Sequence, residues 1–125
     1  MAYRKPDLYD DRCPSRGLLG LIGGKWSMLL VCVLRQGPTR TGALKRAIGG
    51  ISQKMLTQTL RDLERSGLVK RICHDEVPPH VEYQLTSLGR SLSDLVLQIE
   101  DWITKHYPRI ASVQHRVDVE RRAAG

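Results

Sequence analysis

The chain has 125 residues, 41% of them hydrophobic and 26% charged, which fits one globular domain with a single modest core. Its longest apolar stretch, residues 28–34, is too short to cross a bilayer, and the polar residues 1–12 lack the pattern of a signal peptide. The net charge is +7 and the isoelectric point lies near 9.7, which favours an anionic partner without identifying one. We therefore expect a cytoplasmic protein that does not bind a membrane.

The first half of the chain predicts three short helices and one short strand. Apolar side chains recur there at helical spacing, and Gly-Gly or Gly-Pro pairs end the segments. Residues 1–12 lack this periodicity and are interpreted as an arm. The predicted elements, in chain order, are a helix that begins near Pro14 and closes at Gly23-Gly24, a helix over 25–36, a short strand over 39–41, and a helix over 42–48 with Leu44, Ala47 and Ile48 turned inward.

The second half predicts a helix, a hairpin and a last long helix. Gly49-Gly50-Ile51 forms a tight turn, and Ser52 is a good N-cap for a helix that ends at Gly67. Two strands follow, over 68–73 and 81–85, and Thr86 or Ser87 caps the last helix. A glycine turn between two short helices indicates a helix-turn-helix, and a hairpin directly after it makes it winged. The expected fold class is mainly α with a small β-hairpin wing (α+β), a winged helix-turn-helix.

The positive charge is concentrated in the middle third, which contains the helix after Ser52. Residues 35–71 hold nine cations and two anions, whereas the rest of the chain is balanced. At about 100° per residue, that helix separates into an apolar and a polar arc. The apolar arc holds Met55, Leu56, Thr59, Leu60 and Leu63, and the polar arc holds Gln53, Lys54, Thr57, Gln58, Arg61 and Arg65. Amide, hydroxyl and cationic groups pair with base edges and phosphates, so the polar arc predicts a DNA-reading face rather than a solvated face of mixed charge.

A set of short motifs is spread over residues 13–102. The motifs are Cys13-Pro14, Leu21-Ile22-Gly23-Gly24-Lys25-Trp26, Gly50-Ile51-Ser52-Gln53-Lys54-Met55-Leu56-Thr57, Leu60-Arg61-Asp62-Leu63-Glu64, Gly67-Leu68-Val69, Val77-Pro78-Pro79-His80-Val81-Glu82-Tyr83, Leu85-Thr86 and Gly89. Each motif is weak alone. Taken together, they resemble the HxlR family of bacterial winged-helix transcriptional regulators.

The resemblance implies a homodimer that binds double-stranded DNA at an inverted-repeat operator and regulates nearby genes, with repression favoured over activation. The helix after Ser52 enters the major groove, and the proline-bearing wing lies against the minor groove or the backbone. Such a protein is nucleoid-associated when it is bound to DNA. The DNA-binding residues that the resemblance and the polar arc assign are Arg40, Ser52, Gln53, Lys54, Thr57, Gln58, Arg61, Arg71, Pro79 and His80.

In this family the N-terminal and last helices form the dimer interface. Here the last helix carries an apolar stripe at spacings of four and three residues, from Leu88 to Trp102. This stripe could also pack on the core of its own chain. The interface residues that we assign are Leu18, Leu92, Leu95, Ile99 and Trp102. The expected organisation is an arm at 1–12, a winged-helix domain with its dimerisation helices at 13–107, and a basic tail at 108–125.

The cysteines point to one candidate sensor. Without a C-x-x-C pair, the three cysteines exclude a disulfide scaffold and a zinc site built from four cysteines. Cys32 lies on an apolar helix and is expected to act as a small hydrophobic side chain. Cys13 precedes a helix and lies between Arg12 and Arg16, a setting that favours the thiolate. In several members of the family this cysteine senses oxidants or electrophiles, and in others it has no such role.

Three classes of function remain open. The first is a dimeric regulator whose inducer is an oxidant, a small electrophile acting on Cys13, or a small ligand with no redox role. The second is a winged-helix module whose basic face binds an acidic protein. The third, an enzyme, is disfavoured because Cys73 and His74 are adjacent on a strand and point to opposite faces. The histidines show no metal-ligand spacing, so neither a cofactor nor a metal is expected.

Overall fold

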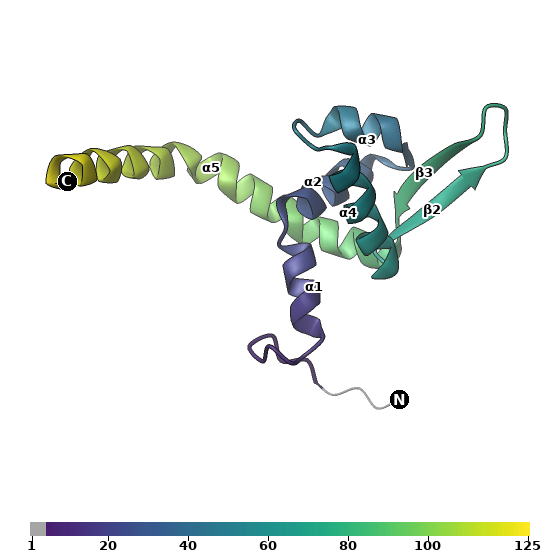
Figure 1. Ribbon diagram of the computed structural model, residues 1–125, viewed down its shortest axis with the longest axis horizontal. Coiled ribbons are helices and arrows are strands. Elements are labelled where there is room, and N and C mark those ends of the chain that lie inside the picture. The colour runs from purple at the N-terminus through teal and green to yellow at the C-terminus, as the bar shows by residue number, and fades with distance from the viewer. Residues whose placement is uncertain (1–4) are drawn as a thin grey trace.

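The computed structural model describes residues 5–125, and the expected fold class is confirmed. Figure 1 shows a helical body from which a hairpin and two helices project. The elements are α1 (Ser15–Ile22), α2 (Lys25–Val33), the 3-10 helix η1 (Leu34–Gln36), β1 (Thr39–Arg40), α3 (Thr41–Ala47), α4 (Gln53–Arg65), β2 (Val69–His74), β3 (His80–Leu85) and α5 (Ser87–Ala124). Helix α2 is shorter than predicted, because its last turn tightens into η1 before Gly37.

The sheet is antiparallel and has three strands in the order β1-β3-β2. Strands β2 and β3 form the hairpin, whose register pairs Val69 with Leu85 at the base and His74 with His80 at the tip. Strand β1 adds two residues on the other side of β3, near the helical body. The hairpin therefore extends away from the helices as a wing (Figure 1).

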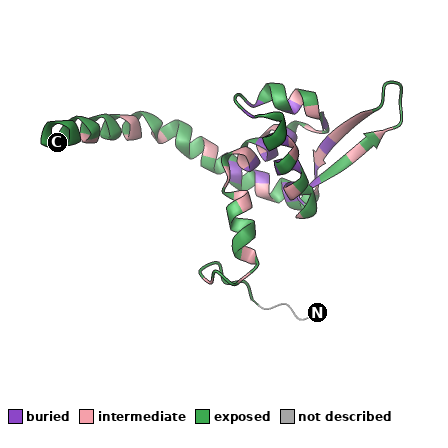
Figure 2. Ribbon diagram, viewed as in Figure 1, coloured by how far each residue is buried: buried purple, intermediate pink, exposed green. Residues whose placement is uncertain are grey.

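The core lies between α2, α3, α4, the base of the wing and the first turns of α5. Figure 2 shows buried residues gathered there, while the wing tip and the far part of α5 are exposed. The fully buried large side chains are Leu30, Val31, Leu34, Leu44, Leu56, Leu60, Leu63 and Val96. These residues come from four helices and η1, so the helix that carries the polar arc is fixed by its opposite face.

Local signals at both ends of α4 match the sequence prediction. The side-chain oxygen of Ser52 accepts a hydrogen bond from the Met55 backbone N–H at 3.1 Å, which caps the helix. Gly67 follows the helix with a φ of +75°, a conformation that glycine adopts without strain. Helix α4 therefore begins and ends at the predicted residues.

Two side chains expected inside are largely exposed. Met55 is 40% exposed because it lies at one edge of the apolar arc of α4, where the covering elements end. Ala47, the last residue of α3, is exposed, whereas Ile48 leaves the helical backbone conformation and is buried. Leu44 is fully buried, as predicted.

The start of α5 is fixed closely to the wing base. Thr86 caps α5 by accepting from the Gly89 backbone N–H at 3.0 Å, and its own hydroxyl donates to the Gly67 carbonyl at 2.6 Å. Gly89 packs so closely that a Cβ there would overlap the carbonyl oxygen of Leu68. One turn later, Ser93 is fully buried beside α2 and η1.

Beyond this anchor, α5 projects away from the body. The helix continues through Pro108 to Ala124, so the residues assigned to a tail, 108–125, are helical except for the last one. A proline inside a helix removes one backbone hydrogen bond, which weakens the helix locally. Figure 1 shows the C-terminal part of α5 on the side of the body opposite the wing, with no other element beside it.

Among residues 5–125, no single helix has both the length and the apolar character that a bilayer crossing requires. Only α1 and the α2–η1 segment together meet those criteria, as a pair bent by 69°.

Candidate nucleic-acid interface

Helix α4 presents a polar face to solvent. Gln53, Lys54, Gln58 and Arg61 are exposed, and Thr57 is half-buried among them. The helix thus separates its faces as its sequence predicts, with the opposite side in the core. This arrangement leaves amide, hydroxyl and cationic groups free to meet a ligand.

Hydrogen bonds within the face orient two of its amides. Gln53 Nε2 donates to Thr57 Oγ1 at 3.3 Å, and Gln58 Nε2 donates to Asp62 Oδ1 at 3.1 Å. The Ser52 oxygen is used as the helix cap, but its hydroxyl hydrogen can still be donated. Asp62, a half-buried carboxylate beside the face, is therefore turned toward Gln58.

Most of the central cations have no anionic partner in the chain. Of the nine in residues 35–71, Arg35 alone lies within 4.0 Å of a carboxylate oxygen in the described part of the chain. Its Nη1 donates to Asp94 Oδ1 at 2.6 Å and to Ser93 Oγ at 2.7 Å, so Arg35 fastens α5 to the body. The remaining cations of this segment are free to attract a polyanion.

The residues predicted around the wing, including Arg40 on β1, lie on two faces of the sheet. The register pairs Arg71 with Tyr83, so Arg71 shares the face that turns to the core near the base. Arg40 and His80 fall on the opposite face, together with Lys70. Side chains alternate between the two faces of a strand, and this alternation places Lys70 on the face of Arg40 and His80. The sequence pattern could therefore have added Lys70 to the predicted contacts.

The tip of the wing is an exposed loop that contains Pro79. Pro79 is fully outside the body in the exposed loop between β2 and β3, and the preceding Val77–Pro78 peptide bond is cis. Arg71 Nη1 donates to Cys73 Sγ at 3.1 Å, which holds its guanidinium along the strand. The wing and α4 are connected through Gly67, so both are positioned by the same core.

Comparisons with known proteins agree with this fold and show the family of the chain. The model of the HxlR-like helix-turn-helix family matches residues 21–111, from α1 to the middle of α5. The chain belongs to the HxlR-like helix-turn-helix family. It is 41% identical over 111 residues to the HTH-type transcriptional regulator YtfH of Escherichia coli (strain K12), covering 89% of this chain and 88% of that protein.

Solved structures of this family share the fold. The transcriptional regulator ytfH from Salmonella typhimurium has a TM-score of 0.84 and 40% identity, over 89% of this chain and 99% of that one. The redox regulator HypR in its oxidized form has a TM-score of 0.68 and 42% identity, over 74% of this chain and 96% of that one. The HxlR-like chain is therefore a winged-helix transcriptional regulator with a DNA-binding helix-turn-helix.

An uncovered apolar stripe follows α5 in this HxlR-like chain. Leu95, Ile99 and Trp102 are 59%, 45% and 55% exposed, and Leu18 on α1 is also exposed. Leu92, which the sequence placed in the same stripe, instead packs in part against the core of its own chain. The stripe thus divides into an inner residue that packs on its own chain and outer residues that stay exposed.

Cys13 lies just before α1 in a polar setting. Its Sγ is 3.0 Å from Ser15 Oγ, and the Asp7 backbone N–H donates to it at 3.5 Å. The hydrogen bond from Ser15, and then that from Asp7, hold the pKa of the Cys13 thiol below its usual range. The expected contribution of Arg12 is absent, because its guanidinium pairs with Asp10 at 3.2 Å. The thiolate is thus favoured by hydrogen bonds rather than by the flanking cations.

The other two cysteines have different environments. Cys32 is partly buried against the core, and burial, together with Glu100, raises the pKa of its thiol to about 11. It therefore stays a neutral thiol at physiological pH, as expected for a packing residue. Cys73 is exposed on the wing and accepts the hydrogen bond from Arg71.

Proposed function

We propose that this HxlR-like regulator binds an inverted-repeat operator as a homodimer and represses the adjacent gene. In this proposal α4 enters the major groove and the hairpin lies against the neighbouring minor groove or backbone. The observation that carries it is the exposed polar face of α4 within a segment whose cations, apart from Arg35, lack carboxylate partners in residues 5–125. Such a face fits the base edges and phosphates of duplex DNA.

Roles follow from the chemistry of each side chain. Gln53, Thr57 and Arg61 are assigned to base edges, because amide, hydroxyl and guanidinium groups make directional hydrogen bonds there. Lys54 and Gln58 flank them. We assign contacts with the phosphate backbone to Ser52, to the cations of the wing and to the tip of the wing. Such contacts position the protein on the DNA without reading its sequence. The backbone contacts comprise Arg40, Ser52, Arg71, Pro79 and His80.

The homodimer is proposed to form through α1 and α5. A second copy of the chain would cover the exposed side chains of Leu18, Leu95, Ile99 and Trp102. One recognition helix contacts few base pairs, whereas two related by a twofold axis read half-sites about one helical turn apart. We assign residues 13–107 to the DNA-binding and dimerising unit, 1–12 to an arm, and 108–125 to a helical extension of α5.

We further propose that oxidants or small electrophiles regulate DNA binding through Cys13. The thiolate attacks a peroxide oxygen and breaks the O–O bond, which yields a sulfenic acid and an alkoxide that takes up a proton. A second thiol then displaces water and forms a disulfide. The lowered pKa of the Cys13 thiol supports this step, as does the similarity to HypR, which is described as a redox regulator.

The test of the proposed function is a gel shift with DNA from upstream of the gene, at two salt concentrations and with competitor DNA. Specific binding should survive the competitor and weaken steeply as salt rises. Arg61→Ala should cost roughly 1–3 kcal/mol on the specific site and little on random DNA. Lys45→Ala, the matched cation on α3, should weaken binding to both and lower the salt slope by about 1.

Three outcomes would contradict these assignments. Equal losses on specific and random DNA for Arg61→Ala would remove its role in reading sequence. Binding to an acidic protein without any binding to duplex DNA would instead favour the interaction-module alternative. Loss of operator binding on addition of a small ligand, unchanged in Cys13→Ser, would favour a ligand-responsive regulator with no redox role.

A further inference from the structure

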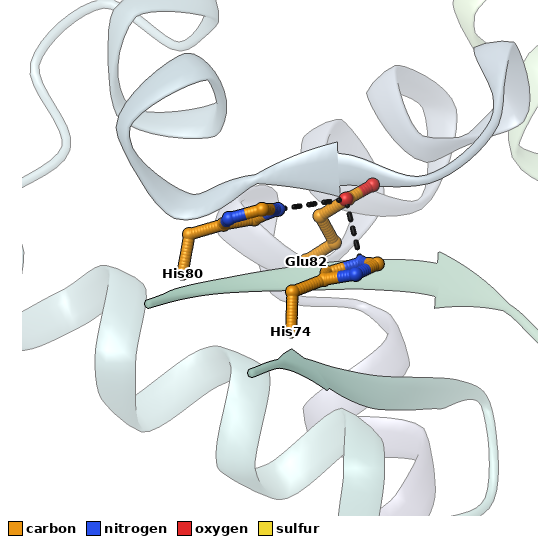
Figure 3. A group of neighbouring side chains, drawn as sticks. All are labelled: His74, His80 and Glu82. Carbon is orange, nitrogen blue, oxygen red and sulfur yellow. Dashed lines mark hydrogen bonds and ion pairs between the residues drawn. The ribbon is translucent and has the colours of Figure 1, made fainter. Parts of the chain in front are cut away.

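Two histidines and a glutamate converge near the tip of the wing. His74 ends β2, His80 begins β3, and Glu82 lies two residues farther along the same strand. Figure 3 shows both imidazole rings turned toward the Glu82 carboxylate. The Oε1 atom of Glu82 lies 2.7 Å from His74 Nε2 and 3.3 Å from His80 Nε2. One nitrogen from each ring is thus directed at the same point.

Hairpin register produces this convergence. His74 and His80 are Cα partners, and Glu82 has the same parity on β3 as His80, so all three project from the face opposite Tyr83. The rings stack with centroids 4.4 Å apart and planes 18° apart. All three side chains are half-buried, so they are held by their neighbours rather than extended freely into solvent. The spacing of these residues in the sequence does not indicate the cluster, because the loop 75–79 separates the two histidines.

The donor atoms are spaced for a small metal ion. Zinc binds nitrogen and carboxylate oxygen at about 2.0–2.2 Å, which places two ligands of a tetrahedral site roughly 3.3–3.6 Å apart. The three donor atoms lie within 4.8 Å of one another, and the pair between His80 and Glu82 already has this separation. The pair between His74 and Glu82 must widen by about half an ångström. The two histidine nitrogens lie within 4.8 Å of each other, so side-chain rotations must set their final separation when an ion enters.

The surroundings also match those of a metal-binding histidine. The second ring nitrogen of such a histidine commonly faces a carboxylate that fixes its orientation. His80 Nδ1 lies 3.8 Å from Glu76 Oε2, while its Nε2 faces Glu82. Cys73 points to the other face of the hairpin and does not join the cluster. Two imidazoles and one carboxylate suit transition metals, whereas Ca²⁺ and Mg²⁺ prefer oxygen ligands.

We propose that His74, His80 and Glu82 bind one divalent transition-metal ion per chain, with water completing the coordination. Binding replaces the histidine–glutamate hydrogen bonds by three bonds to the ion. Since two ligands lie at opposite ends of the loop 75–79, the ion ties the two strands together at the tip. The wing then becomes stiffer and gains positive charge beside Pro79, on the element assigned to DNA.

The test is zinc binding to the full-length reduced protein, measured by isothermal titration calorimetry without DNA. We expect one Zn²⁺ per chain for the parent. His74→Gln and Glu82→Gln keep side chains of similar size and should show no saturable binding at concentrations that saturate the parent. Glu76→Gln should weaken binding by about tenfold, because it removes only the orienting carboxylate. Circular dichroism of each variant verifies that the fold is kept.

Matched controls lie outside the cluster. Cys73→Ser and His115→Ala should bind zinc like the parent, because Cys73 faces away and His115 is exposed far along α5. Parent-like binding by folded His74→Gln or Glu82→Gln would overturn the proposal. Loss of binding in Cys73→Ser or His115→Ala would also overturn it, since the ligands would then lie elsewhere. No DNA is used, so the result is independent of the operator proposal.

Discussion

Gln53 Nε2 donates a hydrogen bond to Thr57 Oγ1 across one turn of α4, at a distance of 3.3 Å. This contact holds the Gln53 amide over the face assigned to the major groove before any DNA arrives. An amide that is already oriented can bind a base edge bidentately with less loss of side-chain entropy. The hydrogen bond to Thr57 therefore fixes the side-chain conformation of Gln53 that the proposed contact with a DNA base requires.

Removing the Thr57 hydroxyl should reduce specificity. Thr57→Val keeps the branched shape and deletes the acceptor for Gln53, and we expect a loss of roughly 1 kcal/mol on the specific site. Thr57→Ser keeps the hydroxyl and is the matched control. Fluorescence anisotropy with specific and random duplexes measures both. A uniform loss on the two duplexes would show that the hydroxyl does not act through sequence reading.

The reactivity of Cys13 should depend on Ser15. The hydrogen bond from Ser15 lowers the pKa of the Cys13 thiol, so Ser15→Ala should raise that pKa toward its ordinary value. The rate of alkylation by iodoacetamide follows the thiolate fraction, so its pH profile should move to higher pH in this variant. Mass spectrometry assigns the modified residue.

Cys32 provides the internal reference for this measurement. Its thiol pKa of about 11 predicts slow alkylation at neutral pH in both proteins. If Ser15→Ala leaves the Cys13 profile unchanged, the hydrogen bond does not control the thiolate. Peroxide that releases operator DNA equally from the parent and from Cys13→Ser would in turn remove the redox proposal.

Substitutions at Leu95 and at Leu92 should have different effects, the first on dimerisation and the second on folding stability. Leu95 is 59% exposed on the outer stripe, so Leu95→Glu should leave each chain folded and shift the dimer toward monomer at micromolar concentration. Leu92 packs partly against the core, so Leu92→Ala should lower the free energy of unfolding without a specific effect on association. Sedimentation velocity and thermal unfolding distinguish them. A Leu95→Glu dimer as stable as the parent would place the interface elsewhere.

Gly89 should not tolerate a side chain. A Cβ there overlaps the Leu68 carbonyl oxygen, which belongs to backbone and cannot turn aside, so Gly89→Ala should destabilise by about 1–3 kcal/mol. Gly49→Ala is the control, because nothing lies within 4 Å of a Cβ at that position. Urea unfolding followed by circular dichroism measures both changes. Equal stability of the two variants would contradict the close packing of α5 on the wing base.

Local chemistry made much of the fold predictable from the sequence. Ser52 and Thr86 cap helices as expected, and Gly67 takes the positive φ that ends α4. Each of these features depends on one residue and its immediate neighbours. The polar face of α4 was predictable for the same reason, since helical periodicity assigns side chains to faces without knowledge of the fold.

Features that depend on contacts across the chain were not predictable. Arg35 counts as a free cation in the sequence, but its partner Asp94 lies 59 residues away. The cluster of His74, His80 and Glu82 required the register of the hairpin, which the sequence leaves open. The helical state of residues after Pro108 was also hidden, because their composition is polar and weakly patterned.

The length of α5 leaves its outer end without support from the body. At 1.5 Å per residue, its 38 residues extend about 57 Å, and only the first turns rest on the body. A solitary helical segment frays in water, since its backbone bonds gain little without packing. We expect amide hydrogens beyond Pro108 to exchange faster than those in the first turns of α5, because only the first turns pack on the body.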